Sequence, residues 1–145
     1  MLDGRVRQVG VVVADDDHEW RAALVESLER EGFAVRAEEL DATGAAGATL
    51  REKPDLCILT TALPGGALLA TGRIAHECPA TQVVLVAANP DEEDCLTSLE
   101  AGAAAYLAKD ASPDRVVAAL RDVIAGIPSI PRRFQSRLVD ELGRP

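Results

Sequence analysis

The chain has 145 residues, 48% hydrophobic and 27% charged, which is enough for one globular domain with its own core. Its formal net charge of −9 argues against nucleic-acid binding, which requires a basic face, and disfavours contact with an anionic membrane. Three cysteines without CxxC spacing predict neither a disulfide framework nor a metal site, and no stretch resembles a signal peptide or membrane span, so we expect a cytoplasmic protein.

Short apolar segments with the length of β-strands recur along the chain. They are Val9 to Ala14, Phe33 to Ala37, Leu56 to Thr60, Val83 to Ala87 and Ala104 to Ala108. The first, third and fourth are apolar throughout rather than alternating, which is typical of strands buried on both faces of a parallel sheet.

Helical patterns separate these strands. The first has an apolar stripe from Trp20 through Leu24 and Leu28, and Gly32 closes it. The second to fifth cover Asp41 to Lys53, Ala67 to Glu77, Asp91 to Ala101, and the stretch from an N-cap at Ser112 to Gly126, with Val116, Leu120, Val123 and Ile124 on one face. This alternation predicts a doubly wound α/β fold, a five-stranded parallel sheet with helices on both faces.

The segment 127–145 follows this domain of residues 1–126 as a tail. Pro131 to Leu142 has the pattern of a short helix with Phe134, Leu138 and Leu142 four residues apart, and its start is basic. Three interpretations stay open: a capping helix packed on the domain, a linker to a further domain, and a dimer contact.

Functional residues of such a fold are expected at the carboxyl ends of the strands. Asp15, Thr60, Ala87 and Lys109 all follow or occupy such ends, and Asp15 opens an acidic triplet that includes Asp16. Acids crowded at a strand end usually hold a divalent cation or a lysine that replaces it. Thr60 stands where a further carboxylate would be expected, so the capacity of the site for chemistry is in question.

Several short motifs, in this order, resemble the receiver domain of bacterial two-component response regulators. They are Ala14-Asp15-Asp16, Arg21, Pro54-Asp55, Leu63-Pro64-Gly65, Ala101-Gly102-Ala103 and the run from Tyr106 to Asp110. The last run is similar to the NarL/LuxR group, in which a linker helix leads from the receiver to a C-terminal helix-turn-helix domain. The tail helix matches that linker, and the DNA-binding domain lies outside this chain.

The resemblance implies a role for each matching residue. Asp15 and Asp16 match the pair that holds Mg²⁺, Lys109 matches the lysine that contacts the phosphoryl group, and Tyr106 matches the aromatic residue whose rotamer reports activation. Thr60 occupies the position of the phosphoacceptor aspartate, and Ala87 that of a hydroxyl residue.

These two departures predict a degenerate receiver that is not an enzyme. A threonine hydroxyl is un-ionised at neutral pH and is a poor nucleophile without a general base, and it lacks the charge that helps recruit Mg²⁺. We therefore expect no required cofactor and at most weak Mg²⁺ binding at Asp15 and Asp16. We hypothesise that Lys109 pairs with Asp15 or Asp16; the alternative is that the acids are solvated at the rim of the domain.

The leading functional hypothesis is the receiver half of a transcription regulator that works without aspartate phosphorylation. Dimerisation, most simply as a homodimer, or binding of a ligand or partner would carry the signal; a cognate histidine kinase is doubtful. One alternative is a stand-alone receiver-like adaptor. Another is an Mg²⁺-dependent phosphatase of the haloacid-dehalogenase type, against which stand Glu19, the apolar end of the fourth strand and the late position of Lys109.

Overall fold

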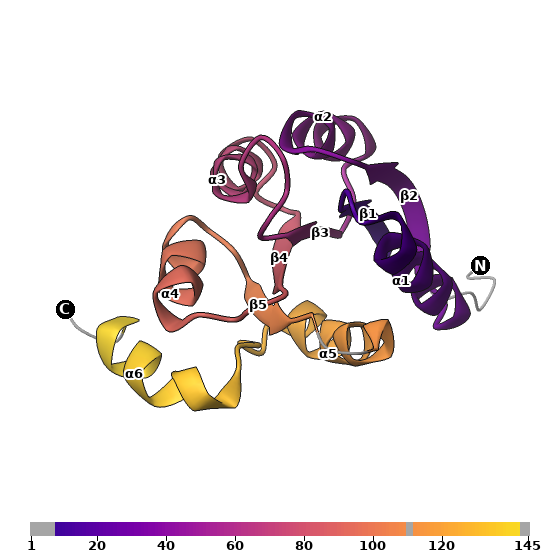
Figure 1. The fold of residues 1–145 in the computed structure, drawn as a ribbon. Helices are drawn as coiled ribbons and strands as arrows, with labels where there is room; N and C mark the ends of the chain where they lie inside the picture. The colour runs from indigo at the N-terminus through magenta and orange to yellow at the C-terminus, as the bar shows by residue number, and fades with distance from the viewer. Residues whose placement is uncertain (1–7, 110–111, 143–145) are drawn as a thin grey trace, which may run out of the picture.

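The protein is described by a computed structural model that covers residues 8–109 and 112–142. Its centre is a parallel five-stranded sheet with the strand order β2-β1-β3-β4-β5 (Figure 1). The strands are β1 (Gly10–Ala14), β2 (Ala34–Glu39), β3 (Leu56–Thr60), β4 (Gln82–Ala87) and β5 (Ala105–Ala108). The doubly wound α/β fold expected from the sequence is therefore confirmed.

Helices cover both faces of the sheet (Figure 1). They are α1 (His18–Arg30), α2 (Ala42–Glu52), α3 (Ala67–Glu77), α4 (Glu92–Glu100), α5 (Pro113–Ile124) and α6 (Arg132–Leu142). Alternate residues of β1 enter two separate cores: Val11 and Val13 pack with α1 and α5, whereas Val12 and Ala14 pack with α2, α3 and α4. Burial on both faces explains why the central strands are apolar throughout.

The second strand was predicted from Phe33 to Ala37, and the observed β2 ends two residues later. It lies at the sheet edge, where its residues are half-buried or exposed. Its final residues, Glu38 and Glu39, are held by pairing with β1 and need no apolar side chain. An apolar pattern therefore misses the end of this strand.

The helix α5 buries Val117 in place of the predicted Ile124. Val116, Val117, Leu120 and Val123 are buried, whereas Ile124 is 41% exposed. The prediction that Ile124 lies on the core face was wrong. Residues 125–128 are exposed as well, so Ile124, the last residue of α5, lies where the chain leaves the core.

The helix α6 lies beside α4 (Figure 1). Phe134 and Leu138 are buried in the same apolar cluster as α4 residue Cys95, which is the packing that the capping interpretation expected. The side chain of Leu142, the third member of the predicted stripe, lies outside the described residues, as does Asp110 of the receiver-like motif. Within the described ranges, no helix combines the length and apolar character needed to cross a membrane.

Candidate functional site

The carboxyl edge of the sheet brings the predicted site residues to neighbouring strand ends. Asp15 follows β1 and is 2% exposed, Thr60 ends β3 at 5%, and Ala87 ends β4 at 1%. Lys109 follows β5 directly. Asp16 is different, because it is exposed to solvent.

An ion pair links the end of β5 to the end of β1. The Lys109 Nζ atom donates a hydrogen bond of 2.8 Å to Asp15 Oδ2, and the two side chains are only 12% and 3% exposed. The other oxygen, Asp15 Oδ1, accepts the backbone N–H of Asp17 at 2.9 Å. The hypothesis that Lys109 pairs with one of the acids is confirmed for Asp15, and a rim position is excluded for that residue.

Neighbouring groups complete the surroundings of the lysine. The ammonium lies 4.0 Å from Asp17 Oδ2 and 4.5 Å from the centre of the Trp20 ring, within the range of a cation–π interaction. Asp17 also caps α1, since its Oδ1 accepts the Trp20 N–H at 3.1 Å. Trp20, which the sequence marked only as a packing residue, is thus also part of this site.

Arg21 links the loop that contains Asp15 to β2. Its Nη1 donates to the backbone carbonyl of Asp15 at 2.7 Å, and its Nε pairs with Glu38 of β2 at 3.1 Å. The sequence placed Arg21 in a motif without assigning it a role. Arg21 and Glu38 are on different elements, so the residue spacing within the helix could not predict their contact.

The donor set at this edge does not fit a tightly held Mg²⁺ ion. Such an ion prefers several oxygens in near-octahedral geometry. Asp15 is already paired with Lys109, Asp16 faces solvent, and Thr60 carries no charge. In the part of the chain that the structure describes, no three His, Cys, Asp or Glu side chains group as metal ligands would.

Tyr106 connects β5 to the first turn of α4. Its side chain is fully buried, its hydroxyl donates to Asp94 Oδ2 at 2.8 Å, and it accepts the Asp91 N–H at 3.1 Å. Burial raises the pKa of the Tyr106 hydroxyl far above its usual range, so the phenol stays a neutral donor. The sequence pattern gave no signal for the contact between Tyr106 and Asp94, which are on different elements.

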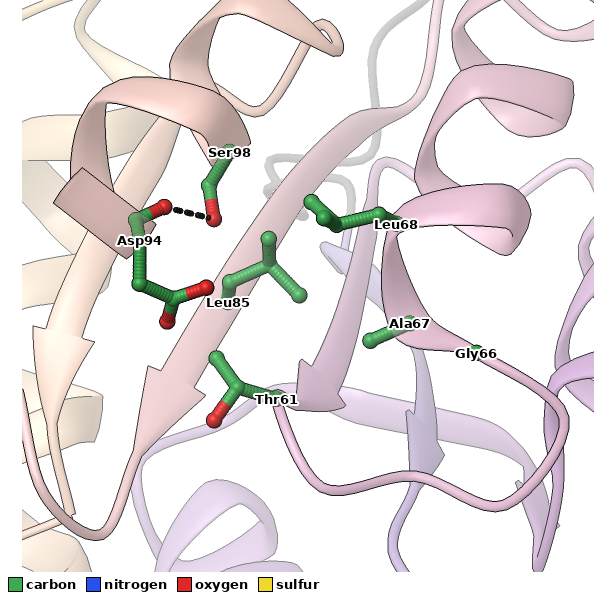
Figure 2. Close-up of a pocket in the computed structure, with 7 residues that line it drawn as sticks. All are labelled: Thr61, Gly66, Ala67, Leu68, Leu85, Asp94 and Ser98. Carbon is green, nitrogen blue, oxygen red and sulfur yellow. Dashed lines mark hydrogen bonds between the residues drawn. The ribbon is translucent and has the colours of Figure 1, made fainter.

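A separate cleft of about 190 Å³ lies between α3 and α4 (Figure 2). Leu68 projects into it from α3, and the Asp94 carboxylate from α4. Thr61, next to Thr60 in sequence, lies at one end of it. The Ser98 hydroxyl beside it donates to the Asp94 backbone carbonyl at 2.7 Å. Apolar side chains, the Thr61 and Ser98 hydroxyls and the Asp94 carboxylate form this lining. Because Ser98 donates to a backbone carbonyl and Asp94 accepts from Tyr106, the lining does not pair a nucleophile with a base.

Comparison with known proteins gives consistent matches. A family model described as the response regulator receiver domain matches residues 11–121. The oxygen regulatory protein NreC of Staphylococcus epidermidis is 29% identical over 134 residues, which are 90% of this chain and 62% of the relative. The chain thus spans less than two thirds of the length of such curated relatives.

Solved structures agree with this match. A LuxR-family two-component response regulator from Aurantimonas sp. SI85-9A1 superposes with a TM-score of 0.84 at 26% identity, covering 95% of this chain and 100% of that one. The receiver domain of the putative response regulator NarL from Mycobacterium tuberculosis gives a TM-score of 0.78 at 27% identity, covering 83% and 99%.

Proposed function

Because this chain belongs to the response regulator receiver domain family, in the NarL/LuxR-type group, we propose that it is a receiver that signals without phosphorylation of an aspartate. The observation that carries the proposal is the residue at the end of β3. That residue is Thr60, a buried side chain without a carboxylate. The resemblance implies that an active receiver has its phosphoacceptor there.

The chemistry of phosphoryl transfer supports this proposal. The reaction needs an anionic oxygen in line with phosphorus and a cation that neutralises the developing charge. The Thr60 hydroxyl is un-ionised at neutral pH, and the Asp15 carboxylate is bonded to Lys109. Ala87 provides no hydroxyl at the end of β4.

The ion pair between Lys109 and Asp15 also supports the proposal, because it holds the side chains of the site in one conformation. With Asp15 bonded through both oxygens and Lys109 stacked on Trp20, the edge of the sheet has an internal cation in place of an exchangeable one. Tyr106 is likewise held inward by two hydrogen bonds. Control then comes from dimerisation or from the binding of a ligand or partner.

The output of the proposed regulator is DNA binding through a C-terminal domain outside this chain. Its relatives include a protein named as an oxygen regulator, and the chain spans 62% of that relative. A net charge of −9 suits a regulatory segment rather than a DNA-contacting one. Phosphotransfer from a histidine kinase has no acceptor at Thr60, and transcription is regulated by other inputs.

Two alternatives from the sequence are separated by simple observations. The family match favours a signalling module over a phosphatase, and receivers are signalling domains rather than enzymes. The encoding reading frame separates a transcription regulator from a stand-alone adaptor. For a transcription regulator, we expect the frame to continue past Pro145 into a helix-turn-helix domain.

The decisive experiment is incubation with a small phosphodonor and Mg²⁺, read by intact mass. We expect no phosphorylated product from the natural sequence. Thr60→Asp adds the missing carboxylate and is expected to raise Mg²⁺ affinity by about tenfold, equivalent to 1.4 kcal/mol. Thr61→Asp is the matched control, because it adds the same charge one residue further and should not produce this gain.

Two outcomes would contradict the proposal. A phosphoaspartate mapped to the carboxyl edge of the unmodified protein would show that another acid accepts the group. An equal gain of Mg²⁺ affinity in both variants would show that general charge, and not the position of Thr60, limits the binding of the metal.

A further inference from the structure

The cleft between α3 and α4 is open because small residues line it on both sides (Figure 2). On the α3 side these are Gly66 and Ala67, and Gly66 has a φ of +100°, which favours glycine over residues with a Cβ. On the α4 side the small residue is Ser98. Leu85 of β4 lies at the base and is fully buried. The described side chains therefore leave a preformed space of about 190 Å³ between the helices.

One part of this cleft is apolar and accessible. Leu68 projects into it and is 37% exposed, whereas the neighbouring Ala67 is buried. An apolar group seated against Leu68 removes leucine surface from water, which is favourable. A cavity of about 150 Å³ accepts a benzene molecule, whereas drug-sized ligands need about 300 Å³ or more. The space thus suits a single ring or a branched alkyl group with a short arm.

The other part of the cleft presents hydrogen-bond acceptors. Asp94 Oδ2 accepts the Tyr106 hydroxyl at 2.8 Å, whereas Asp94 Oδ1 has no hydrogen-bond or ion-pair partner among the described residues. The Ser98 hydroxyl uses its hydrogen on a backbone carbonyl, so its oxygen can still accept a hydrogen bond. No Lys, Arg or His side chain belongs to the lining. The charge of the cleft therefore favours a cation and disfavours an anion.

We propose that this cleft binds a small organic cation, in which a primary ammonium group is joined to one ring or branched alkyl group. The ammonium group has several N–H donors, which suit Asp94 Oδ1 and Ser98 Oγ, while its apolar part lies against Leu68 and Leu85. An alcohol of the same shape has one donor and no charge. The helix α6 lies on the other side of α4, so it does not cover the cleft (Figure 1).

A bound cation acts on Tyr106 through the shared carboxylate. Asp94 holds the tyrosine hydroxyl with one oxygen and the ammonium with the other, so binding changes the charge that the phenol meets. The cleft thereby supplies the ligand input of the proposed function, and it rests on that function only for this regulatory role. Binding is measured without a phosphodonor, so its failure leaves the inference about Thr60 unaffected.

Benzylamine, which is protonated at neutral pH, tests the cleft, and benzyl alcohol is its neutral match. Each is titrated into the chain carrying isotope-labelled tyrosine, because Tyr106 is the only tyrosine of the sequence. We expect saturable shifts of the Tyr106 ring and of the Thr61 and Ser98 amides, with benzyl alcohol binding at least about fivefold more weakly. Equal affinities, or no saturable binding of benzylamine below about 10 mM, would overturn the proposal.

Two charge variants locate the ammonium group. Asp94→Asn keeps the shape of the side chain and an acceptor for Tyr106, and it should weaken benzylamine binding at least about fivefold. Glu93→Gln is the matched control, because it removes the same charge from an exposed side chain outside the cleft. It should change the affinity by less than about twofold. An equal loss in both variants would show that the overall charge of the chain attracts benzylamine, and would overturn the site.

A third variant fills the apolar part. Ala67→Leu places a larger side chain at the lining and should abolish binding of both probes in a protein whose circular dichroism shows an intact fold. Unchanged affinity would put the cation outside the cleft and overturn the proposal. Leu68→Ala covers the case in which Ala67→Leu fails to fold, because Leu68 is partly exposed. It should weaken both probes to a similar extent, and unchanged affinity of both would likewise contradict binding against Leu68.

Discussion

At the residue scale, the Lys109 ammonium is the counter-ion of Asp15, the acid that follows β1. Asp15 is nearly inaccessible to solvent, and a buried carboxylate is costly unless it is paired and hydrogen-bonded. Lys109 supplies the charge, and the Asp17 N–H supplies a further hydrogen bond. The pairing compensates the buried negative charge in a site that has no second buried carboxylate at Thr60 to help hold a metal.

Removing the lysine should therefore expose the cost of burying Asp15. Lys109→Met leaves an unpaired buried carboxylate, for which the typical loss is about 3 kcal/mol of unfolding free energy. Adding Asp15→Asn removes that charge and should recover part of the loss. Urea unfolding of both single variants and the double variant gives the coupling energy. A coupling near zero would show that the two side chains act independently.

Buried thiols give the protein a specific alkaline sensitivity. Cys57 is fully buried and accepts a hydrogen bond from Thr49, and burial raises its pKa from 9.0 to about 12. In the unfolded chain the thiol ionises first, so the unfolded state binds fewer protons above pH 9. The contribution of Cys57 to the free energy of unfolding is therefore fully present below pH 9 and is lost as the pH rises towards 12.

The matching measurement is the free energy of unfolding against pH for the natural chain and for Cys57→Ala. The variant should be less stable at neutral pH because it leaves a small cavity, and it should lose stability less steeply above pH 9. The slope should differ by up to about 1.4 kcal/mol per pH unit. Parallel curves would show that Cys57 is not the group responsible.

At the element scale, α2 shows how tertiary contacts complete a weak local pattern. Its sequence contains Gly44 and Gly47, which disfavour a helix. Asp41 caps the start by accepting the Gly44 N–H at 2.7 Å, and a small-residue face, Ala42, Ala45, Ala46, Ala48 and Thr49, is buried. Close packing of small side chains stabilises a helix whose propensity alone is poor.

The end of α2 carries a correctable strain. Lys53 has a φ of 48° and a ψ of 56°, a left-handed conformation that is unfavourable for residues with a Cβ. Lys53→Gly should stabilise the protein by about 0.5–1 kcal/mol in thermal or urea unfolding. The adjacent control Glu52→Gly lies within the helix and should destabilise it by a similar amount. Loss of stability in both variants would contradict the assignment of strain to Lys53.

At the scale of the whole molecule, the negative net charge of this chain disfavours direct binding to DNA. A net charge of −9 creates an unfavourable potential for phosphate backbones. The chain by itself should leave the electrophoretic mobility of duplex DNA unchanged at about 0.15 M salt. A retarded DNA band that weakens as salt is added would contradict this expectation, because it would indicate a basic DNA-binding surface on the chain.

Local pattern predicted most of the elements. The strands β1, β3 and β4 were found within a residue at each end because continuous apolar runs have few alternatives, and Ser112 marked the start of α5 as its N-cap. Asp91 was predicted as the first residue of the fourth helix, whereas it is the N-cap of α4. The edge strand β2 and the exposed Ile124 were missed in part. Both lie at the boundary of the core, where strand pairing and chain direction determine burial and hydropathy does not.

The sequence by itself determined the parallel α/β fold, the acids after β1, the lysine after β5 and the absence of a carboxylate at Thr60, since these follow from residue identity and periodicity. Only the tertiary structure decided which acid the lysine meets, because Asp15 and Asp16 are adjacent in sequence yet one is buried and the other exposed. It also decided the partners of Tyr106 and the docking of α6 on α4. Those contacts join residues far apart along the chain, and their geometry exists only once the sheet has brought its strand ends and edge together.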